Sequence, residues 1–227
     1  MLVEFAPALF LAEGPVVSFF GFPYATRMAV VRLPGGGTWV WSPVALTPGL
    51  AHEVESLGPV ECIVSPNKLH HLFLGQWQER WPAARVFAPP GLARRRPDLR
   101  FDATLDDRPD GAWAPEIDQV VFRGSPAMEE VVFYHRPSGT ALVGDLVQRL
   151  DLSTMPRWKR LVMRLDGLGD PRGGTPREWR LSFLRRGAAR EARRRILDWK
   201  PRRLVIAHGA CAQEDATSIL EHALAWA

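Results

Sequence analysis

Short apolar runs divided by turn residues are the dominant pattern along the chain. The first clear example is a hairpin, in which residues 28–33 and 38–41 flank the turn sequence Pro-Gly-Gly-Gly at 34–37. Runs of this kind are too short for helices and predict buried strands. The predicted strands are 28–33, 38–41, 60–64, 85–88, 119–123, 130–135, 140–143 and 204–207.

Helical spacing of apolar residues separates several of these strands. Leu50, Val54 and Leu57 share one face of a segment that begins at Thr47, and the proline that follows suits the first turn of a helix. A second helix is predicted from about Lys68 to the Trp-Pro pair at 81–82. The other predicted helices are 157–165, 188–199 and about 214–226, whereas 167–175 is typical of a loop.

The order of elements predicts an α/β fold made of two mixed sheets with helices outside them. The length of 227 residues suits one larger domain, and two smaller domains are the alternative. We therefore expect a single domain over 1–227, in which 151–185 is divergent and forms a lid or an insertion. A composition of 46% hydrophobic and 24% charged residues excludes a disordered chain and a coiled coil.

Charge is distributed unevenly along the chain. Residues 151–203 contain 16 Lys and Arg against 6 Asp and Glu, in a chain whose net charge is +4. Such a region is typical either of solvated helix faces or of a surface for an anionic partner. Because no nucleic-acid-binding motif accompanies it, we favour the solvated faces.

The sequence also carries information on location. It has no run of roughly 20 apolar residues that would span a membrane, and it lacks the pattern of a signal peptide. We expect a cytoplasmic protein whose partner is a small molecule, including an anionic one, and not a membrane or nucleic acid. Cys62 and Cys211 are too few for a disulfide scaffold or a four-cysteine zinc site.

The candidate chemistry lies where predicted strands end. His70, Asp145 and His208 each follow an apolar strand, although they are far apart in the sequence. Loops at strand ends often carry functional groups. Two imidazoles and one carboxylate are suitable ligands for zinc, iron or manganese, with a position left open for water. The alternative for Asp145 is a helix cap, and for each histidine a hydrogen-bonding role.

Three segments resemble the metallo-β-lactamase superfamily. Residues 64–71, VSPNKLHH, stand where that superfamily has Thr-His-x-His-x-Asp-His, 131–146 resemble its strand, hairpin and Gly-Asp segment, and 204–209, LVIAHG, resemble its last strand and final histidine. The resemblance implies an αβ/βα four-layer sandwich of two mixed sheets flanked by helices. It is closest to a divergent subfamily of unassigned function with a degenerate metal-binding signature.

The departures from the superfamily pattern concern one of its two metals. Ser65 and Asn67 stand at the first two histidines, Leu69 at the aspartate, and Gly124 near the middle histidine. The resemblance therefore implies a single divalent metal (Zn, Fe or Mn) on His70, Asp145 and His208, and an empty site is the alternative. Asn67 and Lys68 are predicted to bind substrate, Lys68 as a positive charge for an anion.

His71 is expected away from the ion, because neighbours on the predicted helix point about 100° apart.

Three functions follow as hypotheses. The first is a mononuclear metal-dependent hydrolase of an ester, lactone, thioester or phosphoester, in which metal-bound hydroxide is the nucleophile and His70, Asp145 and His208 form the catalytic centre. The second is a binding or scaffold protein that has kept the fold without metal or activity. The third is an anion or nucleic-acid binder that uses the basic region 151–203.

Overall fold

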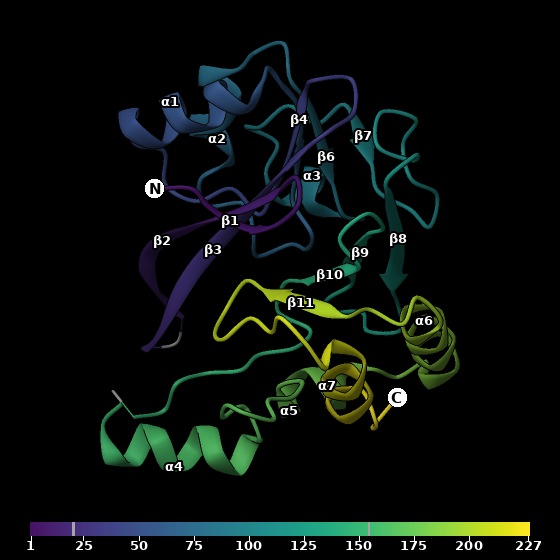
Figure 1. Cartoon of the computed structure of the whole chain (residues 1–227). Helices are drawn as coiled ribbons and strands as arrows, with labels where there is room; N and C mark the ends of the chain where they lie inside the picture. Colours follow the sequence, from purple (N-terminus) through teal and green to yellow (C-terminus); the bar gives the residue numbers. More distant parts are fainter. Residues whose placement is uncertain (20, 154) are drawn as a thin grey trace.

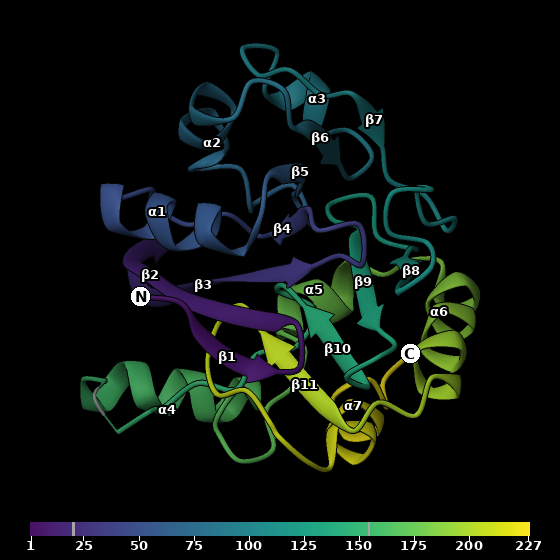
Figure 2. The same cartoon turned by 45° about the horizontal axis from the view of Figure 1, so that its top comes forward.

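The strands form two separate sheets, which face each other across a shared apolar core (Figures 1 and 2). The computed structural model describes residues 1–19, 21–153 and 155–227. Sheet A has the order β1-β2-β3-β4-β5-β6-β7 and is antiparallel up to β4 and parallel beyond it. Its strands are β1 (Val3–Ala6), β2 (Leu9–Phe19), β3 (Phe22–Arg32), β4 (Thr38–Trp41), β5 (Val60–Val64), β6 (Arg85–Ala88) and β7 (Ala103–Thr104).

Sheet B has the order β11-β10-β9-β8 and is also mixed, since β10 pairs with β11 in parallel and with β9 antiparallel. Its strands are β8 (Ile117–Phe122), β9 (Glu130–His135), β10 (Thr140–Val143) and β11 (Arg203–Ile206). The helices are α1 (Pro48–Leu57), α2 (Leu74–Arg80), α3 (Leu92–Arg95), α4 (Arg157–Asp166), α5 (Arg177–Ser182), α6 (Arg186–Asp198) and α7 (Ala216–Ala223).

Alternation along the buried strands builds four layers. On β4, Trp39 and Trp41 point into the core between the sheets, whereas Val40 packs towards the helices α1 and α2. On β11, Val205 points into the same central core, and its neighbours Leu204 and Ile206 pack against α6 and α7. Because side chains alternate between faces with a period of two, each buried strand serves two apolar layers. The αβ/βα sandwich predicted from the sequence is therefore confirmed.

The segment after β5 differs from the prediction. Residues 68–73 form turns, and helix α2 begins only at Leu74. The Asn67 side-chain oxygen accepts a hydrogen bond from the Leu69 amide, and the Ser65 hydroxyl donates to the carbonyls of Asn67 and His70. Such local bonds compete with helical ones. The prediction of a helix from Lys68 is therefore wrong.

The N-terminal hairpin was only partly predicted. Strands β2 and β3 are long, and their register shifts between Glu13 and Val16, where Gly14 and Pro15 interrupt the pairing. Proline in a sheet is confined to edges and bulges, so Pro15 is accommodated by the shift. Because prolines interrupt the apolar pattern in this region, apolar runs did not predict β2.

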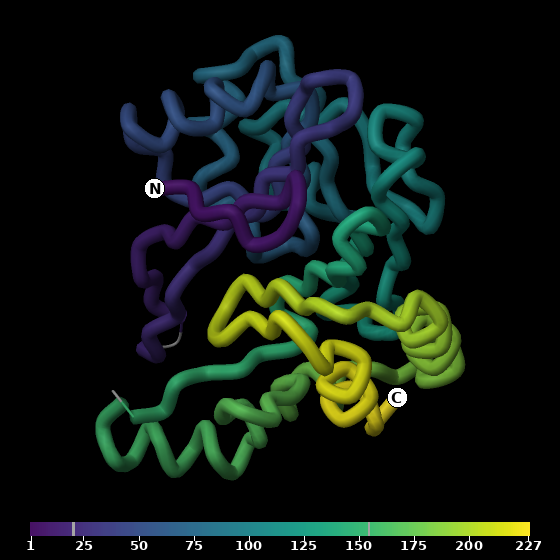
Figure 3. Tube along the Cα trace, viewed as in Figure 1, coloured from purple at the N-terminus to yellow at the C-terminus, as the bar shows by residue number. Residues whose placement is uncertain are grey.

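Residues 151–185 connect the parallel strands β10 and β11 as part of a long crossover. The trace in Figure 3 leaves sheet B after β10, runs out to α4 at the edge of the molecule, and returns through α5 and α6. Its division from the rest as a lid or an insertion, and the single domain over 1–227, stay predictions. No helix among the described residues is long and apolar enough to cross a bilayer.

Candidate metal centre

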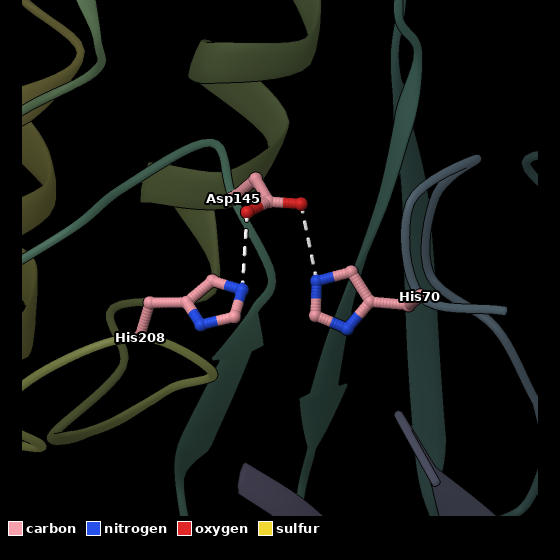
Figure 4. Close-up of side chains that lie close together, drawn as sticks. All are labelled: His70, Asp145 and His208. Carbon is pink, nitrogen blue, oxygen red and sulfur yellow. Dashed lines mark hydrogen bonds and ion pairs between the residues drawn. The ribbon is translucent and has the colours of Figure 1, made fainter. Parts of the chain in front are cut away.

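Three strand ends bring His70, Asp145 and His208 to one place. Asp145 follows β10, and His208 follows β11, which lies parallel to β10, so the two strands end at the same edge of sheet B. His70 comes from the turns after β5 in the facing sheet. One ligand-type atom from each residue lies within 4.8 Å of the others. Figure 4 shows the two imidazoles on either side of the Asp145 carboxylate.

The distances at this centre are short and specific. His70 Nε2 lies 3.1 Å from Asp145 Oδ2, and His208 Nε2 lies 3.2 Å from Asp145 Oδ1. The two imidazole rings are 5.3 Å apart between centroids. Around a tetrahedral zinc ion with ligand atoms at about 2.0–2.2 Å, two ligand atoms are about 3.4 Å apart. The donor set suits a divalent ion of this kind, and one atom from each residue lies within 4.8 Å of the others.

The outer nitrogen of each imidazole fixes which ring nitrogen carries the proton. His208 Nδ1 lies 2.7 Å from the Ala25 carbonyl, which can only accept, so Nδ1 must donate. His70 Nδ1 lies 2.7 Å from the Ser42 hydroxyl, whose own proton is donated to the Arg27 carbonyl at 3.0 Å. His70 Nδ1 therefore also donates. This is the arrangement that metal-ligating histidines adopt, with the second nitrogen bonded to the protein.

The inner nitrogens, the two Nε2 atoms, require a proton or a cation between them and the carboxylate. In the neutral form, each Nε2 presents a lone pair to a carboxylate oxygen, and two acceptors repel each other at this distance. A cation resolves the conflict, either as a metal ion or as a proton on each ring. The centre is thus built around positive charge.

The charge state of Asp145 follows from its neighbours. Burial raises its pKa, but the two imidazoles of His70 and His208 outweigh burial and hold the pKa of Asp145 far below its usual range. For His208, burial lowers the pKa and the Asp145 carboxylate outweighs that effect, so the pKa lies above its ordinary value. The carboxylate is therefore ionised at neutral pH.

A second buried carboxylate holds the Asp145 loop in place. Glu130, at the start of β9, accepts hydrogen bonds from the backbone N–H groups of Gly144, Asp145 and Leu146. It also accepts one from the Asn67 amide. Burial and the nearby Asp145 raise the pKa of Glu130 to about 7, although the four donors favour its ionised form.

The two other predicted site residues differ in their contact with the centre. Asn67 is fully buried and donates to both Glu130 and Asp145, at 2.8 Å each. The Lys68 side chain lies against Gly91, in the loop after β6. Neither residue is among the described residues that line the neighbouring cavity. The substrate contacts of Asn67 and Lys68 stay predictions.

His71 lies in the turns beside His70, so the helical argument about its direction is wrong. Its Nδ1 is 2.8 Å from the Arg96 guanidinium, and burial together with that charge lowers the pKa of His71. A neutral His71 can accept this hydrogen bond.

A cavity of about 260 Å³ opens beside the three residues and includes them in its wall. Sequence reasoning missed most of its other residues, because they come from separate segments without a shared pattern. Gln148 is buried, and its side-chain oxygen has no hydrogen-bond partner among the described residues. Arg95 and Glu178 are further charged groups in the wall. The remaining wall is largely apolar and consists of Val17, Ser18, Phe19, Tyr24, Thr26, Ser42, Pro43, Val44, Leu69, His71, Leu72, Phe73, Pro176 and Trp179.

Comparison with solved structures defines the class of fold. The chain is similar to the DIM-1 metallo-β-lactamase exposed to ceftazidime, at 15% identity and a TM-score of 0.68, over 100% of this chain and 95% of that one. A metallo-β-lactamase from Pontibacter korlensis is similar at 16% identity and a TM-score of 0.66, over 100% and 97%. FIM-1 from Pseudomonas aeruginosa in its mono-zinc form is similar at 12% identity and a TM-score of 0.66, over 100% and 93%. The chain has the metallo-β-lactamase-like fold.

The family is defined by sequence. The model described as Domain of unknown function (DUF4336) matches residues 19–162, and the chain belongs to that family. The match includes His70 and Asp145 and ends before His208. A comparison with curated proteins finds no match.

Proposed function

We propose that this protein is a metal-dependent hydrolase with one divalent ion held by His70, Asp145 and His208. The observation that carries the proposal is the convergence of His70 Nε2 and His208 Nε2 on the Asp145 carboxylate, with both outer nitrogens bonded to the protein. When bound, such an ion would acidify a water molecule and polarise a substrate carbonyl.

The chain's own residues would position the reactants. The Ala25 carbonyl and the Ser42 hydroxyl hold the two rings in orientation, and Glu130 holds the loop that carries Asp145. The largely apolar cavity wall favours an ester, lactone or thioester over a phosphoester, because little of it compensates a buried anion. A donor group on the substrate can meet the unpartnered oxygen of Gln148.

Metal content and zinc titration test the proposal. Protein purified without chelator, and then titrated with Zn²⁺ in a calorimeter, is expected to hold close to one equivalent. His70→Ala and His208→Ala should each abolish tight binding. His135→Ala is the matched control, because His135 is also buried but lies at the other end of β9. Absence of uptake by the wild type, or equal loss in the control, would contradict the proposal.

A second candidate is a binding protein of the same fold without catalysis. It is favoured by Ser65 and Asn67, which stand where the superfamily carries other metal ligands. Both side chains are fully buried and form hydrogen bonds to other groups of the protein. This candidate predicts that ligands of the cavity bind equally well to the wild type and to His208→Ala.

A further inference from the structure

Helix α4 turns its apolar side to solvent. Trp158, Leu161, Val162 and Leu165 fall within an arc of about 100° on a helix of 3.6 residues per turn, and they are 61, 58, 45 and 60% exposed. Met163, on the opposite side of the helix, is buried. A surface helix ordinarily packs its apolar stripe against the core, so the orientation of α4 is reversed. Figure 1 shows this helix at the periphery of the molecule.

Basic side chains flank the apolar arc. Arg157, Lys159 and Arg164 lie beside the arc and Arg160 lies on the opposite side of α4, whose one acidic residue is Asp166 at the end of the helix. The Lys159 ammonium lies 5.4 Å from the ring centre of Trp158, next to the arc, and donates to the Gly21 carbonyl. An apolar face bordered by Lys and Arg, with a tryptophan, is typical of helices that lie in the interface of a membrane.

The basic side of α4 also borders a second cavity, of about 670 Å³. Arg160, Arg164, Arg172 and His222 line it, together with Asp151 and Asp170, and Asp170 is already paired with Arg149 at 2.7 Å. The Arg160 guanidinium donates to the carbonyls of Ser153 and Met155, and its Nε atom is buried without a hydrogen-bond partner among the described residues. A phosphate oxygen is the acceptor that such a guanidinium takes most readily.

We propose that α4 docks along its length on an anionic phospholipid surface. Its apolar arc would enter the boundary between headgroups and acyl chains, and Arg157 and Arg164 beside the arc would meet lipid phosphates. A second copy of the chain suits the face less well, because a two-fold dimer would set the same basic side chains against each other. Nucleic acid would leave the apolar arc uncovered.

This proposal departs from the expectation of no membrane partner. That expectation rested on the absence of a spanning segment, and docking on a surface requires none. The sequence does not predict which side of α4 faces solvent, because that depends on how the helix packs in the fold. The proposal is independent of the metal centre.

Sedimentation of the full chain with lipid vesicles tests the proposal. Vesicles of phosphatidylcholine mixed with phosphatidylglycerol should bind the protein, and binding should weaken as salt is raised, whereas phosphatidylcholine alone should bind it weakly. Leu161→Glu should reduce binding to the anionic vesicles by about tenfold or more, since it places a negative charge in the arc. Leu165→Glu serves as a second variant of the same kind.

The matched control is Val3→Glu on β1, because Val3 is 54% exposed and the charge change is the same. It should leave binding within about twofold of the wild type. Thermal melts should be similar for all variants, since each altered side chain is exposed. No binding to anionic vesicles, or binding that neither α4 variant weakens, would overturn the proposal. So would a dimer in lipid-free solution that Leu161→Glu dissociates, since the occupant would then be a second copy.

Discussion

Sheet B has a buried histidine at each end, and the two ends treat the imidazole in opposite ways. At one end, His208 is 7% exposed and faces the Asp145 carboxylate, which raises its pKa. At the other end, His135 is fully buried, its Nδ1 bonds to the Ser138 hydroxyl, and its Nε2 has no hydrogen-bond partner among the described residues. Burial lowers the pKa of His135 to about 4.

The comparison shows that burial alone does not create a site for a cation. Both imidazoles are removed from water, which disfavours their charged forms. Only the end with Asp145 supplies a carboxylate at hydrogen-bond distance, and there a second imidazole converges on the same group. The Glu116 carboxylate lies 3.8 Å from His135 Nε2, beyond hydrogen-bond distance. His135 is therefore a structural histidine, whereas the other end is organised for positive charge.

The largest effect is expected from removing the shared carboxylate. Asp145→Ala should lower zinc affinity roughly 10²–10³-fold, because one of the three ligands is lost from a site whose binding free energy is on the order of 10 kcal/mol. Competition with a chromophoric chelator measures the affinity. If the zinc affinity of Asp145→Ala stays within a few-fold of the wild type, the Asp145 end of sheet B is not a metal site that depends on this carboxylate.

The pH dependence of stability sharpens the comparison at the His135 end. Below its ordinary pKa of about 6.5 the unfolded chain protonates His135, whereas the folded protein does so only near pH 4. This residue should therefore cost the folded state about 3 kcal/mol of stability as pH falls from 6.5 to 4, with no further loss below that. Urea unfolding of the wild type and His135→Gln should show the flatter pH profile in the variant. Parallel profiles would refute the assignment.

A smaller effect is expected from the carboxylate that supports Asp145. Glu130→Gln replaces an oxygen that accepts N–H groups with an amide that donates, so the Gly144–Leu146 loop should shift. We expect zinc affinity to fall about 10–100-fold and the free energy of unfolding to fall by about 1–3 kcal/mol. Calorimetric titration and chemical denaturation measure the two quantities. If both are unchanged, Glu130 does not position Asp145.

The smallest effect concerns the outer bond of His70. Ser42→Ala removes the acceptor for His70 Nδ1, which should weaken zinc binding by about tenfold while stability changes little. Ser138→Ala is the matched control, since it removes the corresponding bond of His135. Its zinc affinity should equal that of the wild type, and equal losses in the two variants would argue against an orienting role for Ser42.

Much of the central fold follows from local pattern. Strands β9 and β10 have the bounds predicted from their apolar runs, because both are buried on two faces and end in clear turns. The β2–β3 hairpin was underestimated, since a register shift accommodates residues that usually end strands. The turns at 68–73 depend on bonds from Ser65 and Asn67 that no periodicity reveals.

The candidate site was predictable only in part. Strand ends and the family resemblance singled out His70, Asp145 and His208. The supporting contact of Glu130 with Asp145 arises because β9 and β10 are paired neighbours, and its role depends on side-chain direction. The same holds for Gln148, which faces a cavity assembled from distant segments. Burial of Asn67 and its bonds to Glu130 and Asp145 likewise depend on the fold.

Zinc K-edge X-ray absorption on protein loaded with one equivalent of Zn²⁺ tests the central claim most directly. The account predicts a first shell of nitrogen and oxygen at about 2.0–2.2 Å, with the outer-shell scattering of two imidazoles. It also predicts that the two-imidazole signature is lost in His208→Ala, which should no longer hold the ion tightly. A shell without imidazole scattering, or a spectrum unchanged by His208→Ala, would contradict the account.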